Sequence, residues 1–325
     1  MADALSQLPG RHTVQEYDRL YGTFRSGQYM LPHDEKEAER LDMMNTMIRV
    51  TRPAGPTRLT LVPMESLKRP ASALSERVRV LDLGCGTGVW MNELAQELPD
   101  AEFVGVDIHY QGPPSLLPNV AIRAPWDYEG PWALGERSWD MIHLQLGLGS
   151  VSDWLGLFRK VLRHLVPGKG YFESVEIDFQ PRCDDGTLQP GKLTDWWDLY
   201  IKGSYEAFNR RLHYEPTTGE MLKTAGFKEK DIFHTVYKIP LNDWSKKNRE
   251  AGAWWQICMS PGINETGGFG LEAMSLAPLC KFSNWPPEHV KRLCSEAFAQ
   301  AADPNVHAYN ELHVWTARAP GTNDG

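Results

Sequence analysis

The residues best suited to chemistry form a glycine-rich loop, DLGCGTG, which runs from Asp82 to Gly88. Glycine lets a backbone approach a ligand closely and adopt conformations that other residues avoid. The helix expected after the loop would present unpaired N–H groups at its first turn. A dinucleotide-binding loop that begins at Gly84 would need another glycine where Val89 stands, so the spacing argues against that class of protein.

A second acidic residue, Asp107, lies nineteen residues beyond the loop, at the end of the next expected strand. A carboxylate in that position can accept both hydroxyls of a ribose. The acidic Asp82 disfavours phosphate and suits the ammonium group of an amino acid. Together these residues predict a nucleoside with an amino-acid tail, namely S-adenosylmethionine. The alternative is that both acids are ordinary residues of strand-end turns. The expected cofactor contacts in this region are Asp82, Gly84, Cys85, Gly86, Gly88, Asp107 and Ile108.

DLGCGTG and GVD resemble the class I S-adenosylmethionine-dependent methyltransferases, and matching that pattern residue by residue implies further candidates after the third and fourth expected strands, among the N-terminal tyrosines and among the acids of the fifth strand. Trp126 is expected to stack on the adenine, unless it belongs to the core, and Asp127 to accept from its exocyclic amine. His143 and Gln145 close the fourth strand beneath the methyl donor and are the catalytic candidates. His143 would be either a base or a packed histidine, whereas Gln145 would bond to the cofactor or the substrate.

Aromatic and acidic residues complete the candidate site. Tyr29, with Tyr17 and Tyr21, could close over the sulfonium, because aromatic faces attract cations; the alternative is a segment docked by its aromatic side. In the fifth expected strand, three acids share a buried element, which is unfavourable unless they are paired. These acids are Glu173, Glu176 and Asp178, and either of the last two would face the substrate or bond to Arg182.

The elements that must position these residues alternate between short apolar strands and amphipathic helices. This alternation predicts an α/β fold with a mostly parallel sheet and helices on both faces. Strands are expected at 77–84, 102–108, 119–124, 139–146, 171–179, 231–241 and 306–317, and helices at 89–98, 152–164, 193–210 and 217–225. The long helical stretch before the last strand exceeds an ordinary loop and predicts an inserted cap at about 245–300.

The chain is expected to divide at residue 77. Residues 1–77 would hold a loose tail over the first sixteen residues, then the aromatic cluster and a helix from about Asp34. Residues 78–325 would form the domain that carries the glycine loop. We expect residues 17–50 and the cap to roof the cofactor from the side on which the parallel strands end.

Composition excludes several classes of protein. The net charge of −8 disfavours a broad basic face for nucleic acid. No apolar run reaches the roughly 18 residues of a membrane span. The five cysteines include no C-x-x-C pair, and no metal site is expected. Twelve tryptophans suit a core, a pocket or a partner surface. In the adjacent pairs Trp196–Trp197 and Trp254–Trp255, one ring of each is a candidate for contact with another chain or the substrate.

The motifs resemble a known family. DLGCGTG followed by GVD is similar to the class I S-adenosylmethionine-dependent methyltransferases, whose fold is Rossmann-like. The segments GQYMLPHDEKEAERLD, PWALGERSWDMIHLQLGLGSV, VEIDFQPRCDD and HAYNELHVWTAR resemble the fungal LaeA family, including paralogues of the VipC type. The resemblance implies a nuclear methyltransferase that regulates secondary metabolism and sporulation together with a velvet-domain protein, with a protein as a possible substrate.

Three functions remain open at this point. A nuclear regulator predicts an apolar, Trp-rich outer surface for a partner. A biosynthetic methyltransferase predicts an open, apolar pocket under the cap for a small molecule or peptide. A protein that binds the cofactor without turnover would need neither feature. Methyl transfer can rest largely on proximity and orientation, and a base is needed only if the acceptor must lose a proton.

Overall fold

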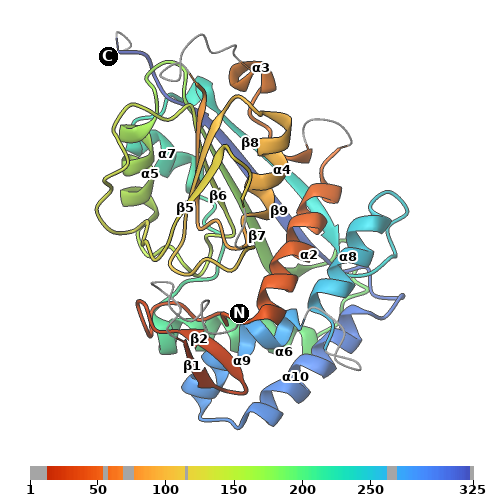
Figure 1. Ribbon diagram of the computed structural model, residues 1–325. Helices are drawn as coiled ribbons and strands as arrows, with labels where there is room; N and C mark the ends of the chain where they lie inside the picture. The colour runs from red at the N-terminus through yellow and green to blue at the C-terminus, as the bar shows by residue number, and fades with distance from the viewer. Residues whose placement is uncertain (1–12, 54–57, 69–76, 114–115, 262–268, 323–325) are drawn as a thin grey trace.

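The computed structural model describes residues 13–53, 58–68, 77–113, 116–261 and 269–322, and its centre is a seven-stranded sheet (Figure 1). The strands lie in the order β5-β4-β3-β6-β7-β9-β8. All neighbouring pairs are parallel except those of β9, which runs antiparallel to β7 and β8. The predicted fold class is therefore confirmed. The strand bounds are β3 Arg79–Leu83, β4 Glu102–Val106, β5 Val120–Arg123, β6 Met141–Gln145, β7 Tyr171–Arg182, β8 Ile232–Pro240 and β9 Tyr309–Arg318.

Helices cover both faces of the sheet because the strand side chains alternate between two apolar cores. Leu81 and Leu83 of β3 pack with α5 (Trp154–His164) and α7 (Thr218–Ala225), whereas Val80 packs with α4 (Val89–Glu97). A third core joins the end of β7 and β9 to the helices beyond the sheet edge. The sheet is therefore fixed in register, since a slip of one residue would exchange the two faces.

The helix α2 (Glu35–Thr51) begins where the sequence predicted, after Asp34. The Asp34 side chain accepts the backbone N–H of Glu37, which satisfies one of the unpaired groups of the first turn. Asp34 also binds the guanidinium of Arg19 through both oxygens, at 2.6 Å each. This ion pair connects the start of α2 to the segment before it.

The expectation of a loose tail up to residue 16 is wrong for its last four residues. Strand β1 (Thr13–Glu16) pairs antiparallel with β2 (Arg19–Gly22) in a small hairpin. All four residues of β1 are exposed, so the segment lacks the burial pattern that marks a strand. The Arg19–Asp34 ion pair joins the hairpin to the start of α2, and no local pattern reveals this contact.

The predicted cap is helical and lies between β8 and β9. It consists of α8 (Arg249–Met259), α9 (Gly270–Ser283) and α10 (Pro287–Ala301). Helix α6 (Lys192–Phe208) packs against α9 and α10, and α2 packs against α8. Figure 1 shows α6, α9, α10 and the hairpin gathered at the lower end of the molecule, whereas α2 and α8 lie on its right, beside the lower part of the sheet. Short helical turns at Met64–Leu67 (α3) and Glu229–Asp231 (η3) complete the described elements.

No helix within the described residues combines the length and the apolar character that crossing a bilayer requires. The division of the chain at residue 77 stays a prediction. Helix α2 packs on α4, α8 and β8, so the residues before that boundary are in contact with those after it.

Candidate functional site

The glycine loop leaves β3 in the conformation that its sequence demands. Gly84, Gly86 and Gly88 have φ angles of 70°, 55° and 76°, a region that favours glycine. The N–H groups of Gly84 and Cys85 donate to the carbonyl of Val106 at the end of β4. The loop is thus fastened to the neighbouring strand, and Gly84, Cys85 and Gly86 line a deep pocket; Gly88 instead caps the start of α4.

Asp107 lies at the other side of this loop. Its two carboxylate oxygens accept the N–H of Gly86 at 2.8 Å and the N–H of His109 at 2.7 Å. Burial raises the pKa of Asp107 to about 6. Asp107 and Ile108 both line the pocket, so the structure brings the predicted ribose acceptor beside the glycine loop. Each oxygen has one backbone donor and retains a lone pair for a ligand hydroxyl.

His143 is packed among other side chains and is not exposed to solvent. It is fully buried, and its ring stacks on Trp90 with 3.5 Å between centroids. Nδ1 lies 2.9 Å from Oδ1 of Asp82, and Nε2 lies 3.7 Å from Oε2 of Glu173. The arrangement favours the packed-histidine interpretation. It also means that one oxygen of Asp82 is engaged inside the protein, although both Asp82 and His143 line the pocket.

Gln145 ends β6 and lines the pocket, as expected. Its side-chain amide donates to Oδ1 of Asn45 at 3.4 Å, and Asn45 in turn donates to Glu93 at 3.2 Å. The helix α2 therefore orients Gln145 from above. The neighbouring Asp42 of α2 accepts the hydroxyl of Thr87, which ties the same helix to the glycine loop.

The segment after β5 places its residues differently from the prediction. Trp126 packs against Trp132, with centroids 6.0 Å apart, and does not line the pocket. Tyr128 lies in the pocket instead, and its Cε1 would be 3.3 Å from a Cβ at Gly84. Asp127 lines the pocket, but its carboxylate lies 3.0 Å from the guanidinium of Arg25. The aromatic residue that lines the pocket is thus Tyr128, two residues after the expected Trp126.

Of the three tyrosines predicted to close over the pocket, only Tyr29 lines it. Tyr17 and Tyr21 meet edge to face at 6.1 Å within the hairpin region. The ring of Tyr29 packs against that of His33 in a tilted arrangement, with 5.3 Å between centroids, and His33 stacks on His109 at 4.2 Å. This stack joins the N-terminal segment to the residue that also binds Asp107. The expectation that residues 17–50 roof the pocket agrees with these contacts.

The pocket continues beneath the cap into a part that we call the cap end. It is lined by Arg40, Met44, Glu176, Trp197, Tyr200, Leu212 and Met274. The cap proper contributes Met274 of α9, whereas α6 contributes Trp197 and Tyr200. The guanidinium of Arg40 is bound by Glu37, with 2.8 Å between Nε and Oε2. We did not predict Arg40, Tyr200 or Met274, because their helical spacing is also that of core residues.

The three acids of β7 have separate environments. Glu173 points to the opposite face of the sheet, where its carboxylate accepts the N–H of Leu61 at 2.6 Å. Asp178 bonds to Arg182, as one of the predicted alternatives had it. Glu176 lines the pocket and accepts the N–H groups of Gly147 and Leu148, at 3.0 and 2.9 Å. Burial raises the pKa of Glu176 to about 8.

One group of potential metal ligands occurs within the described residues. Oxygen or nitrogen atoms of Asp178, Glu311 and His313 lie within 4.8 Å of one another. The guanidinium of Arg182 is bonded to Asp178 and lies 3.0 Å from Glu311. A side-chain cation thus already neutralises these carboxylates.

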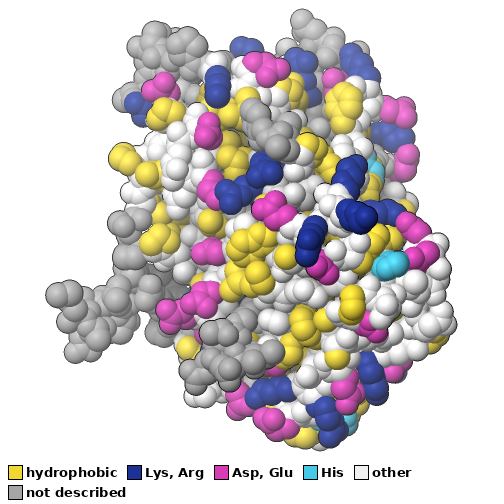
Figure 2. Space-filling view, turned by 90° about the vertical axis from the view of Figure 1, so that its right-hand side faces the viewer, with side chains coloured by type: hydrophobic (Ala, Val, Ile, Leu, Met, Phe, Trp, Pro, Cys, Tyr) yellow, Lys and Arg dark blue, Asp and Glu magenta, His cyan; other side chains and the backbone are white. Residues whose placement is uncertain are grey.

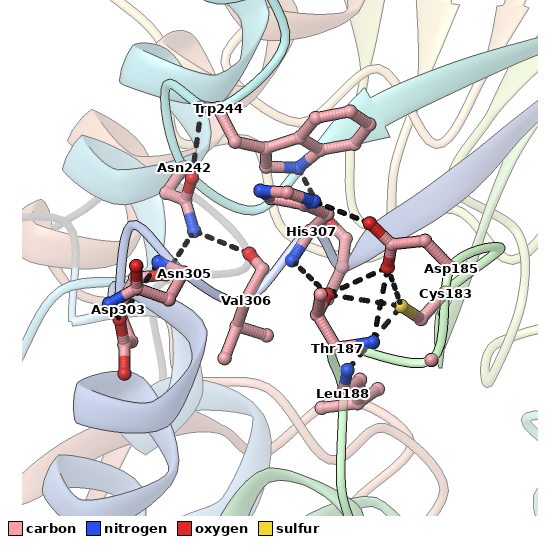
Figure 3. Close-up of polar contacts among 12 residues, drawn as sticks. Cys183, Asp185, Thr187, Leu188, Asn242, Trp244, Asp303, Asn305, Val306 and His307 are labelled. Atoms are coloured by element: carbon pink, nitrogen blue, oxygen red, sulfur yellow. Dashed lines mark hydrogen bonds and ion pairs between the residues drawn. The ribbon is translucent and has the colours of Figure 1, made fainter.

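A polar cluster outside the pocket fastens the loop after β7 to the segment before β9 (Figure 3). Cys183 donates to Asp185 at 3.1 Å, and Asp185 lies 2.6 Å from Nδ1 of His307. The N–H of His307 donates to Thr187 at 2.8 Å, and Trp244 lies against the imidazole. The hydrogen bond to His307 holds the pKa of Asp185 below its usual range. These contacts position the loop that joins β7 to α6 and the segment that leads into β9, rather than the pocket.

Comparisons with known proteins agree with this geometry. Residues 49–229 match the family described as "Methyltransferase domain". The protein-methionine methyltransferase laeA of Emericella nidulans is 39% identical over 308 residues, which are 94% of this chain and 76% of the relative. The secondary metabolism regulator laeA of Monascus pilosus is 39% identical over 311 residues, or 95% and 78% of the two chains. The secondary metabolism regulator LAE1 of Cochliobolus heterostrophus is 38% identical over 308 residues, 94% of each chain.

Proposed function

Since the chain belongs to the LaeA family of secondary metabolism regulators, with an S-adenosylmethionine-dependent methyltransferase domain, we propose that it methylates a methionine side chain of a protein. The relative from Emericella nidulans is named a protein-methionine methyltransferase. The observation that carries this proposal is the continuity of the pocket. One pocket is lined both by the glycine loop with Asp107 and by the cap end, whose lining is mostly apolar.

The residues present fit S-adenosylmethionine. Asp107 offers carboxylate lone pairs beside Gly86, whose missing side chain leaves room for a ligand; Leu41 would be the closest neighbour of a Cβ there, at 3.5 Å. Tyr29 and Tyr128 supply aromatic faces, which suit a cation. When bound, the cofactor supplies an electrophilic methyl group. The protein binds it, orients it through Gln145 and Asn45, and excludes water with α2.

A thioether acceptor suits the cap end. Trp197, Tyr200 and Met274 are nearly fully buried and offer the apolar surroundings that a methionine side chain prefers. Methylation of a thioether releases no proton, so the transfer needs proximity and alignment but no base. This agrees with a His143 that is packed between Asp82 and Trp90.

A small molecule or peptide remains a second candidate acceptor, because the same cap end is the apolar pocket that a biosynthetic enzyme would need. By contrast, the described residues expose no large tryptophan surface. Their large exposed hydrophobic side chains are Val14, Leu20, Phe24, Tyr205, Phe233, Val236 and Ile257. The cap end therefore supports this second function as directly as it supports a protein acceptor.

We propose in addition that the protein works in the nucleus with a velvet-domain partner, which the family resemblance supports. Trp197 is buried in the pocket and Trp254 is partly buried against the core, so neither forms the outer surface that we expected. Figure 2 shows the side of the molecule that carries α8, where hydrophobic side chains gather among Lys, Arg, Asp and Glu. Ile257 of α8 is 45% exposed and is a better candidate for the contact.

Co-purification tests the partner. A velvet-domain protein should be recovered with the tagged protein from nuclear extracts, and Ile257→Ser should weaken its recovery while Tyr205→Ser should not. Absence of any velvet-domain protein from the wild-type eluate contradicts the complex. Equal recovery with Ile257→Ser places the contact elsewhere.

Mass spectrometry tests the acceptor. The protein is incubated with S-adenosylmethionine that carries a deuterated methyl group, together with total protein or small-molecule extracts of its source cells. Label on methionine residues of a protein supports the first proposal. Label confined to the small-molecule fraction supports the second and contradicts the first.

A further inference from the structure

Glu176 is a buried acid of the pocket that has no ion-pair partner among the described residues. Its side chain is 3% exposed and lines the cap end. Its carboxylate sits on a short stretch of backbone after β6, where the N–H groups of Gly147 and Leu148 each donate to one oxygen. A Cβ at Gly147 would lie 3.1 Å from Oε1, so glycine at that position allows the carboxylate its close approach.

Buried carboxylates are unfavourable unless a cation neutralises them. Among the described residues, no Lys, Arg or His side chain forms an ion pair with Glu176. Arg40, at the same end of the pocket, is already bound to Glu37 through Nε and Nη2. Arg210 donates to the carbonyl of Gln28. The local cations are therefore committed elsewhere.

The titratable groups around Glu176 carry no compensating positive charge. His313, its neighbour on β9, has a pKa lowered to about 4 by burial and is neutral at neutral pH. Tyr128 and Tyr214 stay protonated, because burial raises the pKa of both phenols. Asp178, on the same face of β7, is bonded to Arg182. A positive charge that arrives from outside the protein would thus complete this site.

Methyl transfer to a thioether delivers such a charge. The bond between the methyl carbon and the donor sulfur breaks, and its electron pair stays on the donor sulfur. A lone pair of the acceptor sulfur forms the new bond, and the positive charge moves to that sulfur. No proton is released and no further reactant is consumed.

We propose that the Glu176 carboxylate is the counter-ion of the sulfonium charge in this pocket and stabilises that charge as it moves to the acceptor sulfur. This inference rests on the proposed methionine acceptor. Once the cationic ligand displaces its proton, Glu176 acts as a negative charge, held by the N–H groups of Gly147 and Leu148. The carboxylate therefore selects for acceptors that become cationic when they are methylated.

The inference has a readout that does not depend on turnover. Because the pKa of Glu176 is about 8, roughly three quarters of the molecules carry its proton at pH 7.5 in the absence of ligand. A cation within a few ångströms lowers a carboxyl pKa by about 1–3 units. Binding of S-adenosylmethionine at pH 7.5 should therefore release about 0.5–0.75 proton. S-adenosylhomocysteine, whose sulfur is uncharged, should release far less.

Calorimetry in buffers of different ionisation enthalpy measures this proton count. Wild-type protein should release about 0.5–0.75 proton with S-adenosylmethionine at pH 7.5 and close to none at pH 9.5. Glu176→Gln should abolish the release at pH 7.5, whereas the matched variant Glu206→Gln, at an exposed position on α6, should not. Asp107 is largely ionised at pH 7.5, since its pKa is about 6, and adds little to the count.

The two wild-type ligands and the two pH values test the inference even if Glu176→Gln does not fold. Equal proton release with both ligands, release that persists at pH 9.5, or release unchanged in Glu176→Gln would overturn it. A wild-type protein that methylates methionine without releasing a proton on binding would overturn the role of Glu176 and leave the proposed function standing. Failure to bind S-adenosylmethionine at all would refute both.

Discussion

Asp107 provides the sharpest perturbation of the pocket. Its carboxylate holds the glycine loop by accepting the N–H of Gly86, and its remaining lone pairs face the expected ribose. Hydrogen bonds to a charged group contribute about 1.5–3 kcal/mol each. Loss of two such bonds to the ribose in Asp107→Ala would remove about 3–6 kcal/mol of binding free energy. At 1.4 kcal/mol per tenfold, the Kd should rise by a factor of about one hundred to ten thousand.

Calorimetry with S-adenosylmethionine and S-adenosylhomocysteine measures the effect, and both ligands should lose affinity equally because both carry the ribose. Asp100→Asn, at an exposed position after α4, is the matched control and should bind like the wild type. Circular dichroism confirms that the variant is folded. An Asp107→Ala protein that is folded and binds with unchanged affinity would refute the placement of the ribose at Asp107.

Three further predictions follow from the same contacts. Tyr29→Ala should weaken S-adenosylmethionine by about two- to thirtyfold and S-adenosylhomocysteine less, because a cation–π contact is worth about 0.5–2 kcal/mol; equal losses for both ligands would exclude a sulfonium contact, and Tyr205→Ala is the exposed control. Trp197→Ser should lower the free energy of unfolding by about 3–5 kcal/mol in chemical denaturation, as expected for a buried ring; a loss below 1 kcal/mol would argue that the ring is not packed as described. Because burial raises the pKa of Asp107 to about 6, protonation should weaken the affinity for either ligand as the pH falls through 6, by up to about tenfold per pH unit. Calorimetry from pH 5 to 7 measures this slope, which should vanish in Asp107→Asn; a flat profile in the wild type would contradict it.

The sheet could be predicted because its signals are local. The first strands contain short apolar runs, and the parallel register then places strand ends side by side. Asp82 and His143 are partners in that register, so their proximity follows from the fold. Their hydrogen bond does not follow, because it depends on the ring of Trp90, which stacks on His143 from α4.

The aromatic residues of the site were harder to predict because their direction is set by tertiary contacts. Trp126 and Tyr128 both follow β5 closely and are only two residues apart, so their positions in the sequence do not distinguish them. Because Trp126 packs on Trp132, it is Tyr128 that enters the pocket. In the adjacent pair Trp196–Trp197, one ring was expected to contact another chain or the substrate, since neighbours on a helix are about 100° apart. Both rings are buried, because α6 packs against α9 and α10, and Trp197 lines the pocket, so contact with the substrate stays a prediction.

The cap end had no sequence signal of its own. Arg40, Tyr200 and Met274 come from three helices that are far apart in the chain, and each has the spacing of an ordinary core residue. Glu176 was singled out as an acid in a buried strand, but its seat on Gly147 depends on the adjacent connection after β6. Chemistry that is assembled from separate elements becomes visible only once those elements are placed.

Methyl transfer itself tests the central claim most directly. Purified protein is incubated with S-adenosylmethionine that carries a labelled methyl group and with protein extract, and the label is located by peptide mass spectrometry. We predict label on the sulfur of methionine residues with the wild type and none with Asp107→Ala. A wild-type protein that binds the cofactor in the pocket but labels no methionine, or an Asp107→Ala variant that labels at the wild-type rate, would contradict the account.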